Sequence, residues 1–258
     1  SRGLGDVYKR QEVPAREDNF QIDLDALAAA INERTRAVII NSPNNPVGVV
    51  YTRETLEGLA EVLHAKRKEF GSSLFLISDE PYRELAYGPE VSWVPSIYDN
   101  TLVCYSWSKS LSLPGDRIGY VLVPNEVEES ERVMFAVAGA GRALGYICAP
   151  VFFQRVIAAC VDEPVNASAY AANRELLTQG LDELGYHYIA PDGAFYLWMQ
   201  ALEPDAQAFS DKAKEHELLL VPSDSFGVGG WVRVSYCVSA DVIRNSMPAF
   251  ADLQRDYE

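Results

Sequence analysis

The chain has 258 residues, of which 48% are hydrophobic and 23% charged, proportions that are typical of an ordinary globular protein. Its formal net charge of -15 argues against nucleic acid and against a membrane surface as partners, because both attract clustered lysine and arginine. No apolar run is long enough to cross a bilayer. An anionic ligand would therefore have to be bound by a few local arginines.

The cysteine and histidine patterns indicate neither disulfide nor metal chemistry. The four cysteines include no CxxC pair, and three of them lie in apolar runs where a reduced thiol packs as a small hydrophobic group. The three histidines lack the spacing of metal ligands. We therefore expect a cytoplasmic protein without a bound metal.

The first residues look foreign. Residues 6–11 read as the translation of a transposon adapter used in sequencing, so the segment 1–11 is predicted to be non-native and is left out of fold reasoning. On this interpretation the natural protein begins upstream of Glu12, and the chain is a fragment.

Residues 12–163 predict part of a large α/β domain. Three apolar runs are typical of strands buried in a parallel sheet: 37–40, 74–77 and 102–105. A fourth strand, 118–123, follows the third too closely for a helical crossover and is predicted to run antiparallel. Helices are predicted at 23–32, 52–70, 126–137 and 151–161. This order of elements favours a mostly parallel sheet flanked by helices.

Pro164 marks the predicted boundary to a smaller C-terminal α+β domain, residues 164–258. A long helix is predicted at 167–184, where it ends before Gly185, and a second helix at 205–216. Strands are predicted at 195–199, 218–221 and 231–236.

Polar residues follow three of the predicted strands. Asn45, Asp79 and Lys109 each lie just past a strand end, and ligands of such sheets bind beyond the carboxyl ends of the strands. Lys109 is isolated, since no other lysine occurs between Lys68 and Lys212. It is either an amine made nucleophilic toward an aldehyde at a strand end, or a surface lysine in a serine-rich loop.

Two arginines are further candidates for the site. Arg117 starts the antiparallel strand and is expected at the same edge as Lys109. Arg233 lies inside the last predicted strand, where it is either a ligand-binding residue or a residue on the solvated face of an edge strand. Taken alone, the run from Asp79 to Tyr82 reads as an ordinary acidic turn after a strand.

Four motifs in this order and spacing resemble the class I/II aminotransferases, which are fold type I enzymes that use pyridoxal 5'-phosphate. The motifs are Asn45-Pro46-Val47-Gly48, Asp79-Glu80-Pro81-Tyr82, Ser106-Trp107-Ser108-Lys109 with Arg117-Ile118-Gly119-Tyr120, and Arg233-Val234-Ser235. The resemblance covers nearly everything from about residue 20 to residue 258.

The resemblance implies a role for each motif residue. Lys109 would form a Schiff base with the cofactor aldehyde and then move a proton between the substrate Cα and the cofactor C4'. Asp79 would keep the pyridine nitrogen protonated, so that the ring withdraws electrons. Tyr82 and Asn45 would hydrogen-bond the phenolic oxygen.

The anionic groups of cofactor and substrate are assigned to the remaining residues. Ser106, Ser108 and Arg117 would hold the cofactor phosphate. Arg233 would bind the α-carboxylate of the substrate through its guanidinium, with Asn45 next to it.

The resemblance also implies an activity and partners. We expect transfer of an amino group between an L-amino acid and a 2-oxo acid, by a homodimer when the protein is full length. A glycine-containing phosphate loop, an aromatic residue that stacks on the pyridine ring and a tyrosine from the partner subunit would lie upstream, so the fragment by itself is expected to be inactive. Two alternatives remain: a carbon-sulfur β-lyase of the same fold, and the aminotransferase-like effector domain of a transcription regulator.

Overall fold

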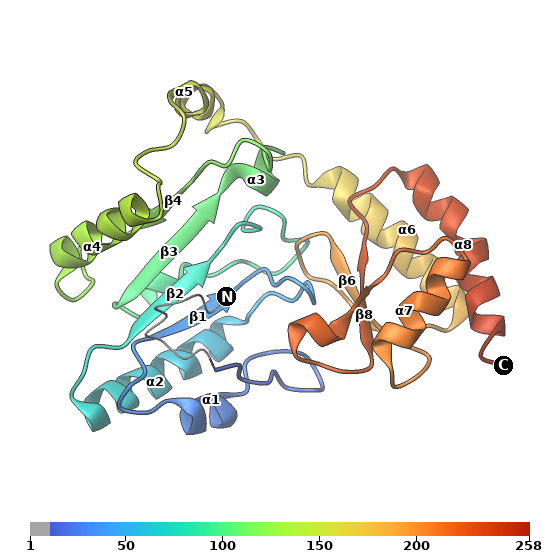
Figure 1. The fold of residues 1–258 in the computed structure, drawn as a ribbon, viewed down its shortest axis with the longest axis horizontal. Coiled ribbons are helices and arrows are strands. Elements are labelled where there is room, and N and C mark those ends of the chain that lie inside the picture. The colour runs from blue at the N-terminus through green and yellow to red at the C-terminus, as the bar shows by residue number, and fades with distance from the viewer. Residues whose placement is uncertain (1–10) are drawn as a thin grey trace.

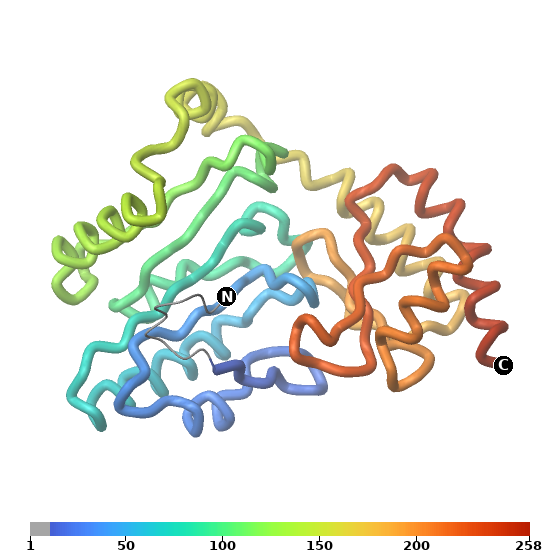
Figure 2. Tube along the Cα trace, in the orientation of Figure 1, coloured from blue at the N-terminus to red at the C-terminus, as the bar shows by residue number. Residues whose placement is uncertain are grey.

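The computed structural model describes residues 11–258, which fold around two four-stranded sheets (Figure 1). Except for Gln11, the predicted adapter-derived segment 1–11 lies outside the described residues. Residues 161–167 lead from one part of the chain to the other, and Figure 2 shows the chain passing there from α5 (Val151–Cys160) into α6 (Ser168–Leu184). The predicted domain boundary at Pro164 falls in this connection and stays a prediction.

The first sheet has the predicted mixed topology. Its strands are β1 (Ala37–Asn41), β2 (Phe75–Asp79), β3 (Thr101–Ser106) and β4 (Gly119–Leu122), in the order β1-β2-β3-β4. The first three are parallel, and β4 runs antiparallel to β3. The predicted α/β class with a mostly parallel sheet is therefore confirmed.

Two helices, α1 (Leu24–Ala30) and α2 (Arg53–Phe70), cover one face of the first sheet (Figure 1). Asp23 caps α1 and Thr52 caps α2, each by accepting a backbone N–H of the first turn. Leucines of both helices pack against alternate residues of β1 and β2 in one apolar core: Leu27, Leu56, Leu59, Leu63, Ile40 and Leu76. This packing fixes which strand residues remain for the opposite face.

The second sheet is antiparallel and has the order β5-β6-β8-β7. Its strands are β5 (Tyr188–Ile189), β6 (Tyr196–Gln200), β7 (Val221–Pro222) and β8 (Trp231–Ser235). It packs with α6, α7 (Ala206–Glu215) and α8 (Ala240–Arg255) around a second apolar core. The short 3-10 helices are Val94–Ser96 and Ser223–Phe226.

Some element predictions are wrong in detail. The strand predicted at 218–221 is reduced to the two residues of β7. Helix α4 (Ser130–Ala143) begins later and extends further than the predicted 126–137. Helix α8 was not predicted, because Pro248 in its interior is normally a helix breaker. The Ser239 hydroxyl caps α8 and Ile243, Phe250 and Leu253 are buried, so tertiary packing outweighs the proline.

Exposed apolar side chains lie on the face of the first sheet opposite α2 and on helices α4 and α5. Ile39 and Val121, which lie on that face, are 69% and 44% exposed. Figure 1 shows α4 and α5 lying outside β4, away from α1 and α2. Phe135 of α4 and Phe152 of α5 are 71% and 70% exposed. We call Ile39, Val121, Phe135 and Phe152 the apolar face; patches of this kind promote association.

We expect Phe135→Glu to reduce self-association of the 258-residue chain without lowering its thermal midpoint, because the ring is exposed and contributes little buried area. Light scattering against concentration, with a thermal scan, measures both quantities. Val242→Glu, at an exposed valine of α8 outside the apolar face, serves as the control and should leave association unchanged. Equal effects of the two variants would contradict the assignment of this face.

Candidate active site

Asn41 and Asp79 lie side by side at the carboxyl edge of the first sheet. They are the last residues of β1 and β2, and they pair directly in the strand register. The Asn41 Nδ2 group donates to the Asp79 backbone oxygen at 2.9 Å and to Oδ2 at 3.2 Å. Burial, and after it the negative charge of Glu80, raises the pKa of the Asp79 carboxyl.

The turn after β1 carries the next site residue, Asn45. Its two X-Pro bonds, Ser42-Pro43 and Asn45-Pro46, are cis. The Asn45 N–H donates to Asn41 Oδ1 at 2.7 Å, so the turn is tied to the strand it follows. Gly48 has φ +87°, and a Cβ there would lie 2.8 Å from the backbone oxygen of Tyr196. Only glycine therefore permits this close approach of the turn to the second sheet.

A joint of backbone hydrogen bonds connects the segment before β6 to the first half of the chain. The Gly48 oxygen accepts the N–H groups of Asp192 and Gly193 at 2.9 and 2.8 Å. The Ala194 N–H donates to the Leu85 oxygen at 2.8 Å. We call residues 192–194 with their partners Gly48 and Leu85 the inter-sheet joint; it fixes the second sheet relative to Asn45.

Lys109 lies on the short helix α3 (Trp107–Ser110), immediately after β3. Its Nζ lies 5.7 Å from the centre of the Tyr82 ring and 5.2 Å from that of Phe195. Both distances are in the range of cation–π contacts. The amine therefore points to the boundary between the two sheets, and not into a solvated serine-rich loop.

Tyr82 lies where the two sheets meet, close to Lys109 and next to the start of β6. It is buried, and its ring packs edge-on against Phe195 and Tyr196. Burial, followed by the nearby Tyr196 hydroxyl, raises the pKa of Tyr82. Arg233 lowers this pKa and Asp79 raises it, so both charges lie close enough to act on the hydroxyl. Tyr82 is therefore a neutral hydrogen-bonding group at neutral pH.

Arg233 reaches this position from β8, which lies between β6 and β7. The interpretation as a residue of a solvated edge strand is therefore wrong. Its Nη1 donates to Asn45 Oδ1 at 2.8 Å, and its guanidinium lies 4.3 Å from the Tyr196 ring centre. The Nε atom is buried without a hydrogen-bond partner, and among residues 11–258 the guanidinium makes no ion pair. A buried donor of this kind fits an anionic ligand.

The three residues predicted to hold a phosphate are less closely assembled. Ser106 ends β3 and Ser108 lies in α3, and within residues 11–258 neither hydroxyl has a hydrogen-bond partner. Arg117 is exposed, has φ +53°, and donates to the Pro114 oxygen at 2.8 Å within its own turn. Gly119 brings β4 close to β3, since a Cβ there would lie 2.3 Å from the Tyr105 oxygen.

Three residues around the site were not predicted from the sequence. Asn41 could have been found from its place directly after the apolar run of β1. Phe195 and Tyr196 gave no comparable signal, because they were assigned as ordinary strand residues and meet Lys109 and Arg233 only through the inter-sheet joint.

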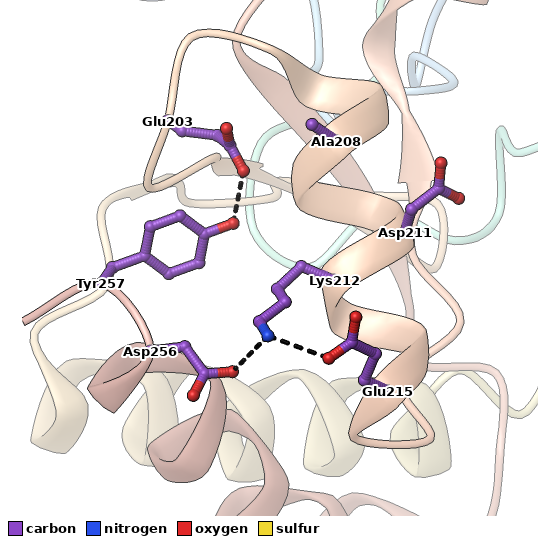
Figure 3. Close-up of a pocket in the computed structure, with 7 residues that line it drawn as sticks. All are labelled: Glu203, Ala208, Asp211, Lys212, Glu215, Asp256 and Tyr257. Carbon is purple, nitrogen blue, oxygen red and sulfur yellow. Dashed lines mark hydrogen bonds and ion pairs between the residues drawn. The ribbon is translucent and has the colours of Figure 1, made fainter.

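A separate hollow of about 440 Å³ lies between α7 and the end of α8 (Figure 3). Lys212 Nζ is 2.9 Å from Glu215 and 3.3 Å from Asp256, and the Tyr257 hydroxyl donates to Glu203. These charged groups are thus paired with one another, and the hollow is no part of the candidate site. The described residues contain no cluster suited to a metal ion, and none of their helices is both long and apolar enough to cross a membrane.

Comparisons with known proteins agree with this architecture. A crystal structure of an amino transferase from Eubacterium rectale matches with a TM-score of 0.92 and 55% sequence identity, over 95% of this chain and 62% of that one. An aspartate aminotransferase from Thermotoga maritima is 31% identical over 91% of this chain and 60% of its own length. An aspartate/prephenate aminotransferase from Thermus thermophilus is 33% identical over 96% of this chain and 63% of its own length.

The fold is that of the aspartate aminotransferases, as a solved structure of a mutant aspartate aminotransferase from Thermus thermophilus also matches with a TM-score of 0.75 at 31% identity. The family model for class I and II aminotransferases matches residues 7–250. The chain belongs to this family, whose members use pyridoxal phosphate. It spans about 60% of the length of the curated relatives that it matches.

Proposed function

We propose that the whole protein is an aminotransferase that moves an amino group between an L-amino acid and a 2-oxo acid. The observation that carries this proposal is Arg233, a half-buried guanidinium that has an unpartnered Nε and is held by Asn45 beside Tyr82. A fork of this kind suits a carboxylate, which amino acids and 2-oxo acids share. The names of the relatives, aspartate and aspartate/prephenate aminotransferases, support the same class of reaction.

The site residues fit pyridoxal phosphate. Asp79 is a half-buried carboxylate whose pKa is raised by burial, and among the described residues it has no cation beside it, so a protonated pyridine nitrogen would complete its environment. The cofactor, when bound, supplies an aldehyde that captures amines and a ring that withdraws electrons from the adjacent carbon. Ser106, Ser108 and Arg117 remain the proposed phosphate ligands.

The chain's own residues then have distinct tasks. Lys109 would hold the cofactor through its amine and would act as the base that removes the proton at the substrate Cα. Tyr82, whose pKa burial raises further above its ordinary value, would donate to the phenolic oxygen of the cofactor. Asn45 accepts from Arg233 through Oδ1, and its Nδ2 would donate to the same oxygen of the cofactor. The proposed working form is a homodimer in the cytoplasm.

Arg233→Ala is expected to weaken amino-acid binding by about 2 to 5 kcal/mol, the cost of truncating one partner of a buried charged pair. The affinity is measured from absorbance changes of the bound cofactor in protein made from its complete reading frame. Arg244→Ala removes an exposed arginine that pairs with Asp241 and should leave the affinity unchanged. Unchanged affinity in Arg233→Ala would place the carboxylate site elsewhere.

The reaction itself is tested by product analysis with an amino acid as sole substrate. Transamination converts the bound cofactor to its amine form and releases a 2-oxo acid. Elimination by a β-lyase would instead yield pyruvate and ammonia from a substrate with a leaving group. Absence of both, together with a basic DNA-binding module in the same reading frame, would favour the effector domain of a regulator.

A further inference from the structure

One side chain, Asn41, connects two of the proposed cofactor-binding residues. Its Nδ2 donates to both the backbone oxygen and Oδ2 of Asp79, at 2.9 and 3.2 Å. Its Oδ1 accepts the backbone N–H of Asn45 at 2.7 Å. Asn41 itself is half-buried at the end of β1, where the strand register sets it beside Asp79. Both polar atoms of the Asn41 side chain therefore bind the two neighbouring site residues.

The direction of the Asn41 amide is fixed by its partners. A backbone N–H can only donate, so the atom facing Asn45 is the oxygen. A backbone carbonyl can only accept, so the atom facing the Asp79 oxygen is the nitrogen. A flipped amide would break both bonds. The side chain must therefore present an N–H donor to the Asp79 carboxylate.

This donor has two effects on Asp79. It engages Oδ2 and leaves Oδ1 for another donor, which sets the rotation of the carboxylate. It also favours the ionised form, and so opposes burial and the Glu80 charge, which both raise the pKa of this group. Among the described residues, no lysine or arginine forms an ion pair with Asp79, and the Asn41 amide is the side-chain donor that faces its carboxylate.

We propose that Asn41 is a positioning residue for the cofactor site: it holds the Asp79 carboxylate ionised and oriented toward the pyridine nitrogen, and holds the Asn45 turn at the same edge. This inference rests on the proposed function. Asp79 itself would contact the pyridine ring of the cofactor, and Asn41 would act through Asp79. Loss of the amide donor should therefore change how the bound cofactor titrates and not only how tightly the chain folds.

Asn41→Asp is the sharpest variant because it keeps the shape and the acceptor for the Asn45 N–H but replaces the donor by a carboxylate oxygen. Two carboxylates would then face each other, and the ionised form of Asp79 would be disfavoured. In protein made from its complete reading frame, we expect about a 10- to 100-fold loss of kcat, the range found for partners that orient a functional group. The pH profile of the bound-cofactor absorbance should shift as well.

Asn44→Asp is a matched control in the same turn. The Asn44 side chain donates to the backbone oxygen of Asn41 at 3.3 Å and accepts from the Val47 N–H at 3.1 Å, with no hydrogen bond to Asp79 or Asn45 among residues 11–258. Like Asn41→Asp, the Asn44→Asp variant replaces an amide by a carboxylate, and it loses one hydrogen bond to a backbone carbonyl. Its absorbance profile should match that of the wild type. Equal profile shifts in the two variants would overturn the proposal.

The exchanged pair Asn41→Asp with Asp79→Asn separates folding from function. It restores one amide and one carboxylate side by side, so thermal stability should recover if Asn41→Asp alone is destabilised. The cofactor titration should stay abnormal, because the carboxylate is now on the wrong strand. A wild-type profile in the exchanged pair, or in a folded Asn41→Asp, would overturn the role of Asn41. Failure of the wild type to bind pyridoxal phosphate would instead refute the proposed function.

Discussion

Replacing Lys109 by alanine is expected to abolish covalent capture of pyridoxal phosphate and to lower turnover by at least about 10²-fold, since general-base catalysis alone contributes about 10² to 10⁴-fold. The reason is chemical: alanine has no amine to attach the cofactor or to move the proton. Reduction with borohydride, followed by peptide mass analysis, measures the capture. Because no other lysine lies between Lys68 and Lys212, a labelled peptide from this region identifies Lys109 directly.

Lys109→Arg distinguishes this chemical role from a packing role. Arginine keeps a positive charge that can lie over the Tyr82 and Phe195 rings, but its guanidinium does not lose its proton in proteins. We expect Lys109→Arg to fold and to remain unlabelled. Lys66→Ala, at a lysine that pairs with Glu69 on α2, should be labelled like the wild type. Labelling of the wild type at a lysine other than Lys109, or labelling of Lys109→Arg as strongly as the wild type, would contradict the assignment.

Asp79→Asn is expected to change activity and stability in opposite directions. Activity should fall by about 10² to 10³-fold, the loss seen when one preorganised electrostatic group is removed from a catalytic site. An asparagine can still accept the hydrogen bond from Asn41 through its oxygen, so the strand ends should remain in place. Steady-state rates at saturating cofactor measure the loss without confusing it with weaker binding.

The stability change follows from the raised pKa of Asp79. The folded chain holds the proton more tightly than the unfolded chain, so above the ordinary aspartate pKa of about 3.9 the ionised carboxylate favours unfolding. Asparagine removes this penalty. Without cofactor, the variant should therefore have the higher thermal midpoint at pH 7, and the difference should vanish as the pH falls below the ordinary value.

A surface aspartate provides the comparison for both measurements. Asp241 pairs with Arg244 on the exposed side of α8, and Asp241→Asn should change neither activity nor the sign of the pH dependence. An Asp79→Asn variant that is less stable than the wild type at pH 7 would show that the hydrogen bond from Asn41 outweighs the burial of the carboxylate in the folded chain. Full activity in the variant would remove Asp79 from the proposed chemistry.

The fold could be predicted where the sequence pattern is local. The three parallel strands are short apolar runs, and Asp23 and Thr52 mark the helix starts by ordinary capping. Prediction failed where packing decides. Pro248 is tolerated in α8 because Ile243 and Phe250 on the same helix are buried. Helix α4 buries no residue at all, so periodicity gave a poor guide to its ends.

The site divides in the same way. Lys109 and Asp79 follow strands of one sheet, so a single topological rule places them at one edge. The contact between Arg233 and Asn45 joins residues 188 positions apart, and no local pattern encodes it. The donor on Asp79 was also missed, because the part that Asn41 plays depends on the register between β1 and β2. Three-dimensional pairing, and not residue type, identifies these groups.

The inter-sheet joint has a consequence for recognition. The Gly48 oxygen holds the N–H groups of Asp192 and Gly193, and a short distance away Asn45 already holds the Arg233 guanidinium. The proposed carboxylate site is thus largely assembled in the folded chain before any ligand binds. The conformational entropy of these groups is lost when the chain folds and not when a ligand binds. A small carboxylic acid that makes few contacts can therefore still bind to the guanidinium with useful affinity.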